Sequence, residues 1–167
     1  MKNKKGDFTG LIYLIVSISA FAIFLLIVGY IVPEIATPMK EQIGISSAIN
    51  DSFDSSTNIA HNTLPSIWLI VFVVLCLGLF ITSFLVQTHP VFVPVFIFLL
   101  ILAVVVSVPL SNAYESLTES ATLSSASAYQ SAIKFTMTNL PVVTFIMGLL
   151  VLIITFAKPG GARETLA

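Results

Sequence analysis

Two histidines are the first residues in this chain that could do chemistry, by sensing pH or by ligating a metal ion. His61 lies in a polar segment and has no cysteine, histidine or paired carboxylate near it at ligand spacing, so a metal site there is not expected. His89 lies in a short turn between two apolar runs. We interpret it as a polar residue at a helix start, near the surface of a membrane.

Carboxylate and thiol chemistry is equally poorly supported. Glu115 and Glu119 are four residues apart and could hold a cation or act as an acid–base pair, but a solvated acidic helix face explains this spacing more simply. Cys76 is the single cysteine, lies in an apolar run and cannot form an intramolecular disulfide. No glycine-rich phosphate loop, nucleophile motif or HExxH motif is present. The sequence therefore predicts no enzymatic activity, no metal and no cofactor.

The composition indicates that lipid surrounds most of the chain. Hydrophobic residues make up 57% of the 167 residues and charged residues 9%, against about 25% charged residues in soluble domains. A soluble fold of this length could not bury so much apolar surface. The net charge of −1 also excludes a strongly basic nucleic-acid-binding protein.

Four apolar runs are long enough to cross a bilayer, which takes about 20 residues of helix. They cover residues 11–32, 67–86, 91–110 and 142–157. None contains Asp, Glu, Lys, Arg or His, and each is apolar all round, as a lipid-embedded helix should be. The predicted fold is therefore all-α: one polytopic membrane domain with four transmembrane helices.

The connections between these runs differ in length. The segment 87–90 is so short that the second and third helices should form a tight antiparallel hairpin. The long outer loops, 33–65 and 111–139, are polar and are expected to be partly helical and to pack on each other. In the first, an amphipathic helix over part of 38–53 would lie on the membrane surface or extend the first span. In the second, Tyr114 and Leu117 could continue the third span.

Basic residues predict the orientation, because they concentrate on the cytoplasmic side. Five belong to the terminal tails and two to the outer loops: Lys2, Lys4, Lys5, Lys158 and Arg163 against Lys40 and Lys134. With four spans, both termini and the short turn would therefore face the cytoplasm.

Small residues four positions apart could let helices approach closely, although chance can also produce such pairs. These packing candidates are Gly78 and Thr82, Ala103 and Ser107, and Thr144 and Gly148. Aromatic residues near span ends could instead anchor the helices at the lipid headgroups. The candidates for this role are Trp68, Tyr13 and Tyr30.

The predicted spans lack the ionisable groups that transporters, pumps and proton relays carry. Paired helices broken by glycine or proline, which are typical of secondary transporters, are also missing. These absences favour a structural membrane protein or an accessory subunit of a host membrane complex. A holin-like pore former is a further alternative, but the long outer loops and the lack of a polar helix face argue against it.

Four short stretches in the second half of the chain carry a family resemblance. They are Thr88–Phe92, Leu110–Glu115, Asn139–Pro141 and Phe156–Lys158. Over about residues 82–158 the chain resembles a family of small membrane proteins encoded by prokaryotic viruses, including tailless phages with an internal lipid membrane. No functional residues are assigned in that family, so the resemblance implies none here.

The resemblance implies a structural component of a virion membrane. Such viruses hold helical proteins in a lipid vesicle, derived from the host membrane, beneath an icosahedral capsid. The basic termini would then face the capsid, and the acidic outer loops would face the vesicle lumen. The implied partners are the lipid bilayer and other membrane or capsid proteins, or further copies of this chain.

Overall fold

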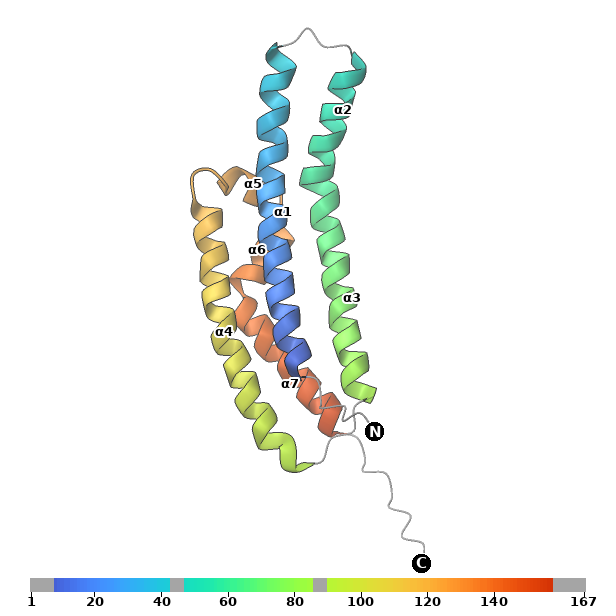
Figure 1. Cartoon of the computed structure of the whole chain (residues 1–167), viewed down its shortest axis with the longest axis vertical. Helices are drawn as coiled ribbons and strands as arrows, with labels where there is room; N and C mark the ends of the chain where they lie inside the picture. Colours follow the sequence, from blue (N-terminus) through green and yellow to red (C-terminus); the bar gives the residue numbers. More distant parts are fainter. Residues whose placement is uncertain (1–7, 43–46, 86–89, 158–167) are drawn as a thin grey trace, which may run out of the picture.

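The computed structural model describes residues 8–42, 47–85 and 90–157, and every regular element in these ranges is helical (Figure 1). Two short elements depart from α-helical geometry: η1 is a π-helix and η2 a 3₁₀-helix. The order is α1 (Phe8–Gln42), α2 (Ser47–Asn58), η1 (Ile59–Thr63), α3 (Leu64–Leu85), η2 (Pro90–Phe92), α4 (Val93–Glu119), α5 (Ser124–Ala128), α6 (Ser131–Thr138) and α7 (Leu140–Phe156).

The long helices form a bundle in which α7 lies between α3 and α4 (Figure 1). The start of α1 and the end of α7 are at the same end of this bundle. The helices α3 and α4 run antiparallel, as the short connection between them requires, but each packs on α7 rather than on the other. The antiparallel arrangement of the predicted hairpin is thus present, with α7 packed against both of its helices. The turn itself, with His89, falls outside the described residues.

Three helices are long and apolar enough to cross a membrane: Gly10–Glu41, Ser47–Leu85 and Val93–Glu119. The protein is thus a membrane-embedded helical bundle with three candidate membrane-spanning helices. The predicted fourth span corresponds to α7, which has 17 residues. It meets the same criterion only together with α6, and the two helices are bent by 74° where they join.

The predicted first outer loop, 33–65, is almost entirely helical where the structure describes it. The helix α1 continues through Pro33 and Pro38 to Gln42, and α2, η1 and α3 form one helix from Ser47 to Leu85. Together they make a helical hairpin that projects beyond the other helices (Figure 1). An exposed ion pair between Lys40 and Asp54 links its two arms. Of the two alternatives raised by the sequence, extension of the first span is the one observed.

The closest packing in the bundle is between α4 and α7, which we call the α4–α7 seam. The buried residues along it recur every three or four positions: Phe96, Leu100, Ala103 and Ser107 on α4, and Leu140, Thr144, Gly148, Val151 and Thr155 on α7. A Cβ atom on Gly148 would lie 2.1 Å from Cδ1 of Leu100. The absence of that atom therefore lets the two helices approach closely.

The six packing candidates fall into two groups. Ala103, Ser107, Thr144 and Gly148 are buried in the α4–α7 seam. Gly78 and Thr82 are exposed on α3, and a Cβ atom on Gly78 would meet nothing within 4 Å. Among the described residues, that third pair therefore lies on the exposed face of α3.

The three expected headgroup anchors also lie in different environments. Trp68 is 1% exposed and stacks on Phe72 with ring centroids 5.3 Å apart, so it belongs to the core of the bundle and cannot contact headgroups. Tyr13 is 69% exposed near the start of α1. Tyr30 is half-buried and lines the pocket described below.

Candidate functional site

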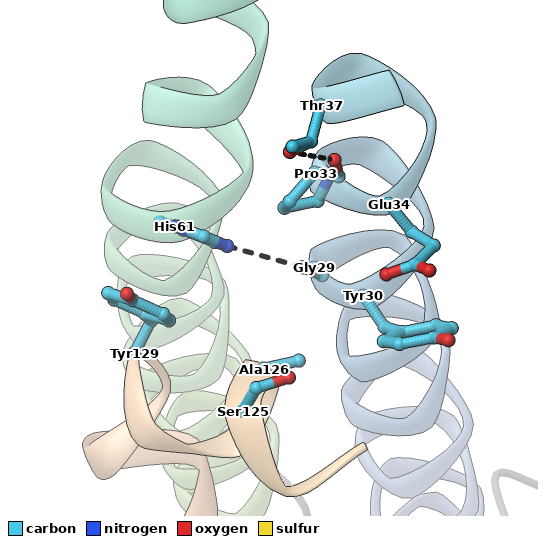
Figure 2. A pocket seen from close by; sticks show the side chains of 9 residues that line it. All are labelled: Gly29, Tyr30, Pro33, Glu34, Thr37, His61, Ser125, Ala126 and Tyr129. Carbon is cyan, nitrogen blue, oxygen red and sulfur yellow. Dashed lines mark hydrogen bonds between the residues drawn. The ribbon is translucent and has the colours of Figure 1, made fainter. Parts of the chain in front are cut away.

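A pocket lies at the base of the helical hairpin, where α5 packs against its two arms (Figure 2). The cavity measures about 220 Å³. One wall comes from α1, with Gly29, Tyr30, Pro33, Glu34 and Thr37. The opposite side is formed by His61 of η1 and by Ser125, Ala126 and Tyr129, which belong to α5 and its C-cap. His61 is about 30 residues from Gly29 along the chain, and Tyr129 is about 100 residues from it. Segments that are distant in the sequence therefore meet at this pocket.

Pro33 explains why His61 points across this pocket. Proline has no amide hydrogen, so the carbonyl of Gly29, four residues earlier, lacks its usual partner in α1. The Nε2 atom of His61 lies 3.3 Å from that carbonyl oxygen (Figure 2). A carbonyl oxygen only accepts hydrogen bonds, so His61 carries its proton on Nε2 and donates it to Gly29.

The His61 ring is also held from below by an aromatic contact. It stacks on Tyr129, with ring centroids 3.9 Å apart and an angle of 5° between the planes. His61 belongs to η1, and single π-helical turns inside longer helices are frequent at functional sites. The stack of His61 on Tyr129 joins the two segments that were predicted to be separate outer loops, 33–65 and 111–139. The packing expected between these two segments is therefore present at this contact.

A second polar contact fixes α6 and α5 against α1, directly beside the pocket. Gln130 is 1% exposed, and its Nε2 donates a 2.8 Å hydrogen bond to the carbonyl oxygen of Leu25. A Cβ atom on Gly29 would lie 2.6 Å from the same Nε2 atom. Glycine at position 29 therefore makes room for the amide, while its own carbonyl receives His61.

The pocket carries one formal negative charge, on the carboxylate of Glu34. Within the described ranges, Glu34 has neither a hydrogen-bond nor an ion-pair partner, and the ion pair found there joins Lys40 to Asp54. The hydroxyl of Thr37 already donates to the carbonyl of Pro33 at 2.9 Å. Two polar groups of the wall, His61 and Thr37, are thus engaged within the protein, whereas Glu34 is free to meet a ligand.

Few of the residues singled out from the sequence come together in this pocket. His61 and Tyr30 do, but Glu115 and Glu119 remain on α4 outside it, and Cys76 is buried on α3. The sequence reasoning missed Gly29, Glu34, Tyr129 and Gln130. One signal was available: a proline four residues after a glycine inside an apolar helix predicts a free carbonyl that needs a donor.

The pocket does not have the side chains of a metal site. Across residues 8–42, 47–85 and 90–157, no group of three or more His, Cys, Asp or Glu side chains could hold an ion. No protein-family model, curated protein or solved structure matches the chain.

Proposed function

We propose that the protein is a structural integral membrane protein that presents a helical hairpin to a partner. The observation that carries this proposal is the continuation of α1 and of the α2–η1–α3 helix beyond all other helices (Figure 1). In α2 no side chain is buried within the chain. Polar and acidic residues on this projection alternate with the exposed side chains of Ile35, Met39 and Ile49, and such a mixed surface suits contact with another protein rather than with lipid tails.

We further propose that α7 completes a fourth crossing and that both termini face the cytoplasm. Two observations support this arrangement: the basic residues of the tails outnumber those of the outer segments, and the start of α1 and the end of α7 lie at one end of the bundle. The hairpin, α5 and α6 would then lie on the opposite side of the membrane. The resemblance of residues 82–158 supports the membrane of a lipid-containing prokaryotic virus as the location.

Cysteine accessibility tests the orientation. A Cys76→Ala background would receive a single cysteine at Ser56, on the exposed face of α2, or at Thr165, in the C-terminal tail. In intact spheroplasts, a membrane-impermeant maleimide should label the Ser56→Cys variant and spare the Thr165→Cys variant until the cells are opened. The reverse pattern, or labelling of both in intact cells, would contradict the proposed orientation.

Fractionation of purified virions tests the location. The protein should remain with the lipid vesicle after the capsid shell is removed, and it should be absent from uninfected cells.

An accessory subunit of a host complex is the rival proposal. The exposed Gly78–Thr82 face of α3 supports it, because small residues allow a neighbouring helix to pack closely. Purification with larger host subunits in fixed stoichiometry, without capsid protein, would favour the rival.

A further inference from the structure

We propose that the pocket at the base of the hairpin binds an organic ammonium group, such as an ethanolammonium or a trimethylammonium group. This binding role is additional to the structural function proposed above and does not depend on it. Four features of the pocket support this role: its charge, its aromatic walls, the packing that shapes it and its position.

The charge of the pocket selects a cation. Glu34 supplies a carboxylate that has no partner in the described part of the chain, and no lysine or arginine lines the cavity. An anionic ligand would be repelled by Glu34 and would find no cationic side chain to offset this, since the N–H of His61 is already donated to Gly29. A positively charged ligand would be attracted to the free carboxylate.

The aromatic walls select an organic cation over a metal ion. Tyr30 and Tyr129 lie on opposite sides of the cavity (Figure 2). Stacking on His61 fixes the Tyr129 ring, although the side chain remains 55% exposed. Aromatic faces attract ammonium groups and are the usual recognition elements for quaternary amines. A divalent metal would instead need several oxygen or nitrogen ligands, and one carboxylate beside an engaged imidazole does not provide them.

The shape of the pocket is set by packing and not by chance apposition of surface side chains. Gly29 removes the side chain that would otherwise fill the space between α1 and Gln130. Pro33 and the π-helical turn place His61 across the opening. These features hold the walls in place in the absence of a ligand, which reduces the ordering cost of binding.

The position of the pocket offers two sources for an ammonium group. The apolar run of α1 ends at Val32, so Pro33 and Glu34 lie where α1 leaves the predicted hydrocarbon region. Phospholipid headgroups with ethanolamine or choline occupy that level of a bilayer. A small soluble amine could enter from the aqueous side, because Tyr129 and Glu34 are exposed.

Tyrosine NMR on the full chain tests the proposal. The chain has four tyrosines, and ring-labelled protein would be placed in nanodiscs of phosphatidylglycerol, which has no ammonium group. Ethanolammonium chloride and choline chloride form the soluble arm of the titration. Nanodiscs containing phosphatidylethanolamine or phosphatidylcholine form the lipid arm. Saturable shifts are expected for Tyr30 and Tyr129, while Tyr13 on the exposed start of α1 should not move.

Matched variants connect the shifts to the pocket. Glu34→Gln should weaken binding about fivefold, as for loss of one partly exposed charge pair. Tyr129→Leu should weaken it about threefold through loss of a cation–π contact. Glu41→Gln removes an exposed carboxylate from the same helix outside the pocket and should leave affinity unchanged. Circular dichroism would verify that each variant keeps its helical content.

Each result decides one question. A response in only one arm identifies the source as headgroup or soluble amine, and a response in both arms shows that the pocket accepts either. The proposal is overturned if neither arm gives saturable shifts of Tyr30 and Tyr129. It is also overturned if Glu34→Gln and Glu41→Gln weaken binding equally, because the attraction would then be a general surface effect.

Discussion

The α4–α7 seam and the base of the hairpin each depend on a glycine, but for different reasons. At the seam, Gly148 makes room for the apolar end of Leu100. At the base of the hairpin, Gly29 makes room for the amide of Gln130, which donates to the carbonyl of Leu25. One contact is made by close apolar packing and the other by side-chain donors that reach helix carbonyls.

The difference follows from the surroundings of each region. Helices inside a bilayer gain no hydrophobic free energy from leaving lipid, so close packing of small residues is their main attraction. Where α1 leaves the apolar region, prolines are tolerated because other side chains satisfy the carbonyls they free. His61 does so at Gly29, the carbonyl that Pro33 leaves without an amide partner. The two regions should therefore respond to different substitutions.

The largest effect is expected from filling the seam. Gly148→Leu places a side chain where Leu100 and Leu11 already lie, so it should lower the free energy of unfolding by about 3 kcal/mol through overpacking. Unfolding in mixed micelles, followed by circular dichroism, measures this change. Gly78→Leu is the matched control and should cost little, since its Cβ atom meets nothing within 4 Å. Equal losses in the two variants would mean that the seam is not specially packed.

A smaller effect is expected from replacing the hydrogen-bond donor of Gln130 with an acceptor. Gln130→Glu replaces a buried donor with an acceptor that faces the Leu25 carbonyl, and it should cost about 2 kcal/mol. Gln130→Met keeps a similar volume and should cost less, because the Leu25 carbonyl keeps its partner within α1. The same unfolding assay compares the two. A Met variant as unstable as the Glu variant would show that the hydrogen bond itself carries the stability.

The pairing of Pro33 with His61 can be tested by a double-mutant cycle. His61→Phe retains an aromatic ring for Tyr129 but removes the donor to Gly29, so it should cost about 1 kcal/mol. In a Pro33→Ala background the new amide hydrogen at position 33 can satisfy Gly29, and the His61→Phe change should then cost less. Additive effects would show that His61 does not replace the missing amide.

The smallest effect is expected at the Lys40–Asp54 ion pair near the tip of the hairpin. Lys40→Ala should change the free energy of unfolding by about 0.5 kcal/mol or less, because exposed ion pairs are weak. Hydrogen exchange of α2 amides measures the local consequence. A loss comparable with that of Gly148→Leu would mean that the hairpin is held together mainly by its charges.

The apolar runs predicted the helical class and the approximate position of each long helix. They left open how far α1 would extend, because the apolar run ends at Val32 and a helix within 38–53 could either extend the first span or lie on the membrane surface. Proline stops a helix when the carbonyls it frees find no other donor. For the carbonyl that Pro33 frees, at Gly29, the donor is His61, which is 32 residues away along the chain. A single sequence cannot show which distant side chain will supply such a bond.

The environments of the aromatic residues were hard to predict for a related reason. Trp68 follows a polar segment, as an anchor at the membrane surface would. That polar segment is itself helical, however, and belongs to the same continuous helix as Trp68. The position that looks like a span end is therefore a middle position inside the bundle. Tyr129 lies in a stretch rich in serine and alanine, and nothing in its local sequence indicates the stack on His61.

The uninterrupted helix from Ser47 to Leu85 has a consequence for distances. Its 39 residues measure about 58 Å at 1.5 Å per residue, whereas the hydrocarbon core of a bilayer is about 30 Å thick. If the helix stands close to the membrane normal, its start is therefore about 25 Å or more from the hydrocarbon. The hairpin then acts as a spacer of fixed length. A second surface attached to its tip would be held at this distance from the hydrocarbon of the membrane.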